Sequence, residues 1–296
     1  MLLLPYTKAI DAMGLAKIER VFEAYQRVKR SERCDRPLLN IYLTAGYPAL
    51  HATQDLLLAV DAAGADFIEL GMPYSDPLAD GPTIQASSAQ ALRNGITLDI
   101  IFEQVAEVRE RVRAPIIAMG YYNQVLQYGP QRFVERCAAV GIDGLILPDL
   151  PLEVYRAELE PDVRAAGLGF SFLVTPRTAE ERVRLLDAST RGFLYVVSSS
   201  STTGSKSSGL DAQAPYFTRL EEYDLKSPRL IGFNISDRQS LLQAGSYTEG
   251  GIIGSAFIRA LTAEDPVRSA RKFIEGLMPT AAKGAAESAD DSHLAQ

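Results

Sequence analysis

The chain has few of the residues on which metal and disulfide chemistry depend. Its 296 residues include two histidines, His51 and His293, and two cysteines, Cys34 and Cys137. Two histidines are too few for a histidine-ligated metal centre, and the cysteines are not spaced as metal ligands, so we expect no bound metal. So few cysteines also fit a reducing compartment, and we predict a cytoplasmic protein.

Long apolar runs and blocks of positive charge are missing as well. No apolar run reaches the roughly 18 residues that suggest a membrane-spanning helix, and the first residues lack the pattern of a signal peptide. The net charge is −7 and the sequence pI is near 5.1, with no basic cluster. We therefore expect neither a membrane nor a nucleic acid as a partner. What is present is an ordinary globular composition, 47% hydrophobic and 23% charged.

Short apolar runs alternate with helical patterns along most of the chain. Eight β-like runs begin near residues 38, 66, 115, 144, 168, 193, 229 and 251, and each is followed by an amphipathic pattern. Eight such units in about 240 residues favour a closed parallel (β/α)8 barrel, or TIM barrel, over an open doubly wound sheet. The chain also lacks the Gly-x-Gly-x-x-Gly loop of dinucleotide-binding sheets.

The segments outside the eight units also carry patterns. Apolar residues at helical spacing over 7–33 predict one or two extra helices before the first strand. We expect residues 1–278 to form a single barrel domain, and residues 279–296, rich in Ala, Ser and Asp, to form a flexible tail. Between the second strand and a helix over 98–112, we expect one long loop, because prolines punctuate it.

One acidic residue lies inside an apolar strand. Glu69 interrupts the run 66–70, and strand alternation places it on the same face as Phe67. If Ile68 and Leu70 face the helices, Glu69 points into the barrel near its mouth, where burial raises its pKa toward that of a general acid/base. The alternative is a buried salt bridge between Glu69 and an inward Lys or Arg. No strand offers an obvious basic partner, because Arg229 stands at the amino end of its strand, away from the barrel mouth. We therefore predict a catalytic role for Glu69.

The loop after this strand carries two more acids, Asp76 and Asp80. By spacing alone, Asp80 is explained as well by a turn before Gly81 as by a functional role. In a barrel, this loop lies at the carboxyl ends of the strands, where working residues gather. The sequence pattern therefore leaves both readings of Asp80 open.

The late loops predict a phosphate site. Strand seven ends in Gly-Phe-Asn-Ile-Ser (232–236), and strand eight ends in Gly-Ser (254–255) before a short helix. Small residues and helix N-terminal amides at these two strand ends favour a bound phosphate. The Ser/Thr/Gly-rich segment 198–209 is either the third side of this site or a mobile lid.

The segment 69–85, Glu-Leu-Gly-Met-Pro-Tyr-Ser-Asp-Pro-Leu-Ala-Asp-Gly-Pro-Thr-Ile-Gln, resembles the signature of the tryptophan synthase alpha subunit family. Further support spans about residues 37–277 and comes from segments 42–48, 120–123, 147–151, 197–204, 232–236 and 254–255. The resemblance implies a (β/α)8 barrel that cleaves indole-3-glycerol phosphate to indole and glyceraldehyde 3-phosphate. It also implies a beta subunit partner in an α2β2-type complex, with pyridoxal phosphate in that partner and no cofactor here.

The resemblance also implies roles for single residues. Glu69 matches the family's catalytic glutamate, and Asp80 matches its catalytic aspartate. Positions around the substrate or its catalytic groups correspond to Tyr42, Thr44, Tyr121 and Thr203, and the phosphate contacts correspond to Gly204, Asn234, Gly254 and Ser255. The chain departs from the family at Asn234, where a glycine is usual, and at Ser199, where an arginine is common. Asp76 is left with a smaller role in loop shape or partner contact.

Two other functions fit the same residues. A free-standing indole-3-glycerol phosphate lyase would release indole without a beta subunit, and the altered lid leaves this possibility open. A non-catalytic subunit would bind ligand and only regulate a partner, but Glu69 and Asp80 argue against it. A metal-dependent sugar-phosphate epimerase fits less well, because it needs several inward His or Asp ligands and the chain has only two histidines. An isomerase of the triose-phosphate type also fits less well, because it needs a histidine at the barrel mouth as well as a glutamate.

Overall fold

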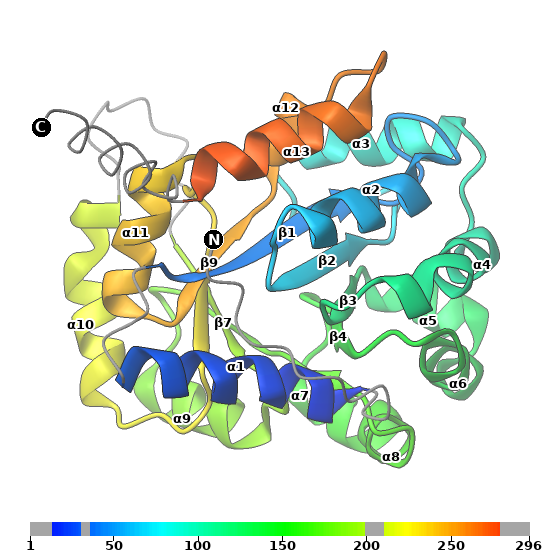
Figure 1. Cartoon of the computed structure of the whole chain (residues 1–296). Helices are drawn as coiled ribbons and strands as arrows, with labels where there is room; N and C mark the ends of the chain where they lie inside the picture. Colours follow the sequence, from blue (N-terminus) through cyan, green and yellow to red (C-terminus); the bar gives the residue numbers. More distant parts are fainter. Residues whose placement is uncertain (1–13, 31–35, 199–209, 279–296) are drawn as a thin grey trace, which may run out of the picture.

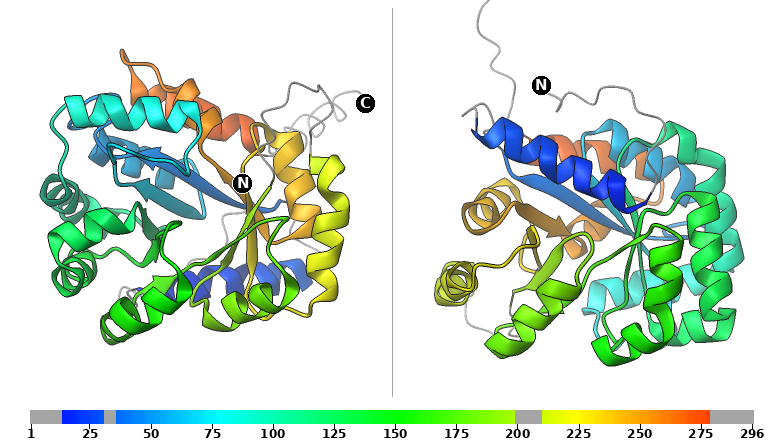
Figure 2. Two further views of the ribbon diagram at one scale, coloured as in Figure 1. Left: turned by 180° about the vertical axis from the view of Figure 1, so that it is seen from behind. Right: turned by 90° about the horizontal axis from the view of Figure 1, so that it is seen from below.

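The computed structural model describes residues 14–30, 36–198 and 210–278 (Figure 1). Parallel strands form the centre of this structure, and helices form its outer layer (Figures 1 and 2). The predicted tail 279–296 and both ends of the predicted helix 7–33 lie outside the described residues. No helix in the described ranges is long and apolar enough to cross a membrane.

Within the described residues, the sheet contains nine parallel strand segments in the order β5-β4-β3-β2-β1-β9-β8-β7-β6. The segments are β1 (Leu38–Thr44), β2 (Phe67–Gly71), β3 (Ile116–Met119), β4 (Gly144–Ile146), β5 (Gly169–Phe170), β6 (Leu173–Val174), β7 (Leu194–Val197), β8 (Arg229–Gly232) and β9 (Gly250–Ile253). Each of the eight predicted strands is present within a residue or two of its expected start.

The two edge segments, β5 and β6, are halves of one strand. Only Ser171 and Phe172 separate them, and these residues bond in opposite directions. The amide of Ser171 donates to the carbonyl of Leu145 on β4 at 3.0 Å, and the carbonyl of Phe172 accepts from Tyr195 on β7 at 2.8 Å. The fifth strand thus joins the two edges of the sheet, which closes the predicted (β/α)8 barrel.

The helices follow the strands in the expected alternation. They are α1 (Leu15–Arg30), α2 (Ala52–Ala62), α3 (Pro82–Arg93), α4 (Leu98–Val108), α5 (Tyr122–Tyr128), α6 (Pro130–Val140), α7 (Leu152–Val154), α8 (Glu160–Ala165), α9 (Glu180–Ser189), α10 (Ala214–Glu222), α11 (Arg238–Tyr247), α12 (Ser255–Ala260) and α13 (Pro266–Leu277). Two of them, α3 and α5, were not predicted from the sequence.

The expectation of one long loop up to residue 98 was wrong, because α3 fills part of it. Pro82 was interpreted as a loop residue, but it occupies the first turn of α3, after Gly81 as the N-cap. Proline is tolerated there, since the first turn has no intrahelical acceptor for its missing N–H. The loop between β2 and α3 is therefore shorter, and α3 holds its far end.

The barrel interior is apolar and closed at one end by α1. Four side chains of α1 pack with inward residues of the strands, and the ring of Phe22 lies 5.1 Å from Phe67 and 6.2 Å from Phe193. Figure 2 shows α1 crossing the ends of the strands. Burying each such side chain contributes about 1.5–3 kcal/mol. The opposite end, where the strands have their carboxyl termini, is left for the loops.

Strand alternation in β2 is as predicted. Phe67 belongs to the interior cluster, whereas Ile68 and Leu70 pack in the larger cluster between the strands and the helices. Because successive side chains point to opposite faces, Glu69 shares the inward face with Phe67. The sheet therefore places the Glu69 carboxyl group inside the barrel, two residues before the strand ends at Gly71.

Candidate active site

Glu69 is buried in the barrel, and among the described residues it has no charged partner that neutralises it. Its side chain is 1% exposed, and the salt bridges of the described residues do not include it. Burial is the main cause that raises its pKa from 4.5 to about 8, and the negative charge of Asp80 adds to the rise. Glu69 therefore holds its proton at neutral pH, as a general acid requires.

Among the described residues, Asn40 is the hydrogen-bond donor to the Glu69 side chain. Its Nδ2 donates to Glu69 Oε2 at 3.3 Å, and this bond opposes the rise in the pKa of Glu69. Asn40 lies on β1 at an inward position two residues before Tyr42, which pairs with Glu69 across the sheet. Sequence reasoning missed Asn40, although the strand alternation that selected Glu69, applied to β1, places Asn40 on the inward face.

Asp80 lies in wetter surroundings, on the loop between β2 and α3. It is half-buried, and Tyr121 Oη donates to its Oδ2 at 3.1 Å. Burial raises the pKa of Asp80 to about 6, and the bond from Tyr121 limits that rise. At neutral pH, Asp80 is therefore ionised in the same site where Glu69 is protonated. Two carboxyl groups with separated pKa values are a common basis for acid/base chemistry.

Tyr121 also fixes the loop that carries Asp80. Its hydroxyl accepts a hydrogen bond from the amide of Ala79 at 3.0 Å, and its ring stacks on Tyr74 with centroids 5.2 Å apart. From the other side, Gln85 on α3 donates to the carbonyl of Asp80 at 2.8 Å. The loop is thus held at both ends, so the position of the Asp80 carboxylate is defined by the fold.

Tyr42, Thr44 and Tyr195 complete the wall around the two carboxyl groups. The pKa of Tyr42 is raised mainly by burial, and also by Asp80 and Glu69. The pKa of Tyr195, on β7, is raised well above its usual value by burial and by the same two carboxyl groups. Thr44 shares a hydrogen bond with Ser87 of α3 at 2.7 Å. Tyr195 was not predicted, although it alternates with Phe193 on the inward face of its strand.

Three of the four predicted phosphate residues, Asn234, Gly254 and Ser255, lie just after β8 and β9. Gly254 is the N-cap of α12, which begins at Ser255. Phe233 and Asn234 both have positive φ, 68° and 56°. Asparagine tolerates this conformation better than most residues other than glycine, which is usual at position 234 in the family. The Asn234 side chain is turned toward Ser198 and donates to its Oγ at 3.3 Å.

Two other polar residues that follow strands, Asp149 and Thr175, make structural hydrogen bonds. Asp149 accepts from the amide of Tyr122 at 2.9 Å, at the start of α5. The amide of Thr175 donates a hydrogen bond to Thr178 Oγ1 at 3.0 Å within the same turn. Thr203, Gly204 and the rest of 199–209 lie outside the described residues. In the ranges that are described, no group of three or more His, Cys, Asp or Glu is placed to hold a metal.

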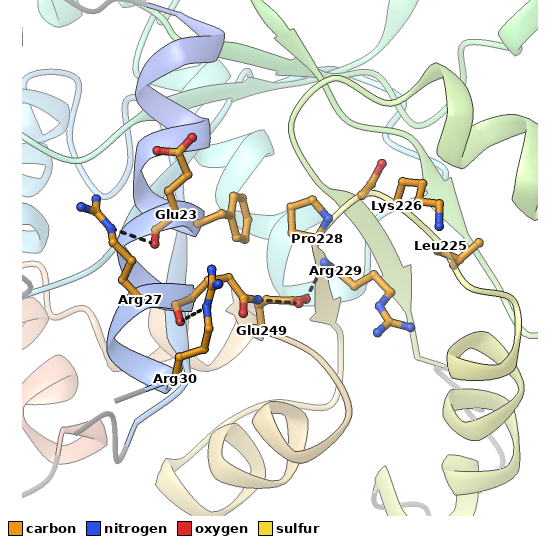
Figure 3. A pocket seen from close by; sticks show the side chains of 11 residues that line it. Glu23, Arg27, Arg30, Leu225, Lys226, Pro228, Arg229 and Glu249 are labelled. Atoms are coloured by element: carbon orange, nitrogen blue, oxygen red, sulfur yellow. Dashed lines mark hydrogen bonds between the residues drawn. The ribbon is translucent and has the colours of Figure 1, made fainter. Parts of the chain in front are cut away.

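A hollow of about 630 Å³ opens at the other end of the barrel (Figure 3). It lies between α1 and the amino ends of β8 and β9, and its lining includes Arg30, Arg229 and Glu249. Much of its polar lining is paired, since Glu249 accepts from the amide of Arg229 at 2.8 Å and Arg30 donates to the carbonyl of Gln26 at 3.3 Å. Barrel enzymes work at the carboxyl ends of strands, so this hollow is not the candidate active site.

Comparison with known proteins identifies the family. The family model described as "Tryptophan synthase alpha chain" matches residues 28–284. This chain belongs to the tryptophan synthase alpha chain family. The resemblance seen in the sequence, carried mainly by the segment 69–85, is thereby confirmed.

Relatives and solved structures of tryptophan synthase alpha chains agree. The chain is 48% identical over 236 residues to the tryptophan synthase alpha chain of Flavobacterium johnsoniae, covering 80% of this chain and 93% of the relative. It is 47% identical over 248 residues to that of Flavobacterium psychrophilum, covering 84% and 98%. The tryptophan synthase alpha subunit of Legionella pneumophila superposes with a TM-score of 0.78 at 28% identity, covering 90% of this chain and 97% of the other. A tryptophan synthase structure from M. tuberculosis, in an aminoacrylate-bound form, gives 0.75 at 29% identity, covering 88% and 97%.

Proposed function

We propose that this member of the tryptophan synthase alpha chain family cleaves indole-3-glycerol phosphate to indole and glyceraldehyde 3-phosphate. The observation that carries the proposal is the pair Glu69 and Asp80, which share one site at the barrel mouth with pKa values of about 8 and about 6. One carboxyl group is protonated and the other is ionised at neutral pH. A retro-aldol cleavage of this substrate needs one group of each kind.

Glu69 moves the protons. The protonated Glu69 carboxyl donates its proton to C3 of the indole ring, which makes that carbon a leaving group. The resulting carboxylate then accepts the proton of the hydroxyl on the adjacent glyceryl carbon as the aldehyde forms. The C–C bond breaks and its electron pair returns to the indole ring. Glu69 is protonated again at the end, so the residue acts first as acid and then as base.

Asp80 stabilises the charge that develops on the ring. Protonation at C3 places positive charge on the indole nitrogen, and the ionised Asp80 accepts the hydrogen bond of its N–H. Tyr121, which donates to Asp80 at 3.1 Å, holds the carboxylate in position. Both roles use carboxyl groups of this chain alone, so the reaction needs no cofactor or metal here.

The remaining predicted residues bind the substrate. Tyr42 and Thr44 line the wall for the indole, together with Tyr121. Gly254 and Ser255 offer the N-terminal amides of α12 to the phosphate, and Asn234 follows the neighbouring strand β8. Thr203 and Gly204, outside the described residues, are expected from the family resemblance to contact the substrate and its phosphate. The single domain over residues 1–278 and the cytoplasmic location stay predictions.

A beta subunit is the partner in this proposal. The relatives of this chain are tryptophan synthase alpha chains, and an alpha2beta2-type complex with pyridoxal phosphate in the beta subunit follows from that family. Leu78, on the loop that carries Asp80, is 83% exposed. An exposed apolar side chain on the same loop as a catalytic residue fits a loop that meets a partner.

A steady-state assay with indole-3-glycerol phosphate tests the proposal. We expect indole release by the purified chain and faster turnover with a beta subunit added. Because Glu69 must be protonated and Asp80 ionised, kcat/KM is expected to follow a bell with limbs near pH 6 and pH 8. Glu69→Gln is expected to bind substrate and lose cleavage. Turnover unaffected by a beta subunit favours a free-standing lyase, and no turnover with either preparation favours a regulatory subunit.

A further inference from the structure

Asn40 is a polar side chain in a barrel interior that is otherwise mostly apolar. It is 0% exposed on β1, and the residues paired with it on the neighbouring strands β2 and β9 are the apolar Phe67 and Ile252. Its Nδ2 donates to Glu69 Oε2 at 3.3 Å. Its Oδ1 has no hydrogen-bond partner among the described residues. A buried amide carbonyl without a partner is unfavourable, so its presence beside Glu69 requires an explanation.

We propose that Asn40 is a positioning residue that gives Glu69 a hydrogen bond in both of its protonation states. A carboxylate only accepts hydrogen bonds, whereas a carboxylic acid also donates one. The asparagine amide carries a donor and an acceptor of nearly the same shape. Rotation about its Cβ–Cγ bond exchanges the two in place. Nδ2 then serves the ionised Glu69, and Oδ1 serves the protonated Glu69.

This role rests on the proposed function, in which Glu69 passes through both states in each turnover. The unpartnered Oδ1 is the acceptor that the protonated state needs, and it lies on the side chain that already contacts Glu69. Rotation of one amide is a small motion, so the carboxyl group keeps its place while its proton leaves and returns. Asn40 itself does not need to touch the substrate.

Among the described residues, the other groups that face Glu69 make no hydrogen bond with its side chain. Asp80 is a carboxylate and raises the pKa of Glu69 by its charge. Tyr42 and Tyr195 face Glu69 from β1 and β7, and their raised pKa values keep their hydroxyls protonated. Among the described residues, the hydrogen bond recorded for the Glu69 side chain is the one from Asn40.

The test is the titration of Glu69 in the Asn40→Leu variant, which keeps the size and loses the amide. The Asn40→Leu change removes the hydrogen bond of both states, but the bond donated to the charged carboxylate is the stronger of the two. The ionised form therefore loses more, and the pKa of Glu69 rises. We expect the alkaline limb of kcat for indole release to move up by about 0.5–1 pH unit and the plateau of kcat to fall about ten-fold. KM is expected to change by less than about two-fold, because Asn40 does not contact the substrate.

Difference infrared spectroscopy, with Glu69→Gln as the blank, reads the Glu69 carboxyl without substrate. In Asn40→Leu, the midpoint of the Glu69 titration is expected to move up by the same amount as the alkaline limb of kcat. The C=O band of protonated Glu69 is also expected to shift in Asn40→Leu, because its O–H loses an acceptor. The matched control is Gln104→Met on α4, a buried amide that donates to the Leu50 carbonyl at 2.7 Å and has an unpartnered Oε1. This control is expected to leave the limb, midpoint and band unchanged.

An unmoved midpoint in Asn40→Leu overturns the proposal, as does an equal shift in Gln104→Met. A purely structural Asn40 would lower thermal stability and leave the titration where it was. Asn40→Ser is the second variant if leucine does not pack, because its shorter side chain still offers a donor and an acceptor. Its midpoint is expected between those of the wild type and Asn40→Leu, and a midpoint beyond the leucine value also refutes the role. If the wild type does not cleave the substrate, the proposed function fails, and the infrared titration still decides the role of Asn40.

Discussion

Glu69→Gln is expected to make the protein more stable at alkaline pH while it removes the proposed catalytic proton carrier. The folded state keeps the Glu69 proton up to a pKa of about 8, whereas the unfolded chain releases it near 4.5. Between these values, folding is coupled to proton uptake. The stability contributed by the protonated group is therefore complete below pH 4.5 and is lost as the pH rises toward 8.

The size of the effect follows from the same two values. Each pH unit in this window removes about 1.4 kcal/mol from the free energy of unfolding. Over the whole window, the loss is on the order of 4–5 kcal/mol, a large part of the 5–15 kcal/mol that stabilises a typical domain. Glutamine has nearly the same shape and never ionises, so the variant escapes this loss.

The assay is urea unfolding followed by circular dichroism at pH 5, 7 and 9. We expect the variant and the wild type to differ by less than about 1 kcal/mol at pH 5, and the variant to be more stable by about 4 kcal/mol at pH 9. Other carboxyl groups with raised pKa values, such as Asp80 and Asp143, are present in both proteins and cancel in the difference. Glu103→Gln, an exposed change on α4, is the matched control.

A difference between variant and wild type that does not change with pH would refute the reasoning. In that case, the folded state does not hold the Glu69 proton above pH 4.5, and the assignment of Glu69 as the initial acid is lost with it. A pH-dependent gain equal to that of Glu103→Gln would have the same meaning.

Three further outcomes are expected. Asp80→Asn lowers kcat for indole release by more than about 100-fold, whereas Asp76→Asn, exposed on the same loop, changes it by less than about three-fold; equal effects would make Asp80 a loop residue only. Tyr121→Phe removes the donor to Asp80, so the pKa of Asp80 rises and the acidic limb of kcat/KM moves to higher pH, as a pH profile would show; an unmoved limb contradicts the bond. Gly232→Ala puts a methyl group 2.2 Å from the ring of Tyr195, so the free energy of unfolding is expected to fall by about 1–3 kcal/mol in denaturant titrations; wild-type stability would mean that the ring moves freely.

Much of the fold could be predicted because the alternation of apolar and polar residues is a local property. All eight strands were predicted, and so was the inward direction of Glu69. The errors came where one residue type serves two structures. Pro82 marks a loop in many sequences, yet it begins α3 here, because the first helical turn tolerates proline. The break in the fifth strand at Ser171 also depends on bonds to two different neighbours, which no local pattern shows.

The sequence by itself determined the barrel and the family, because strand and helix periodicity and a long motif are local properties of the chain. It also proposed Glu69 and, through the family resemblance, Asp80 as site residues. Only the tertiary structure decided how these two carboxyl groups differ. Their pKa values depend on burial and on neighbours distant in sequence: Asn40 from β1, and Tyr121 from the loop after β3. Desolvation and hydrogen bonds act through space, so the separation between a protonated Glu69 and an ionised Asp80 arises when the strands bring these groups together.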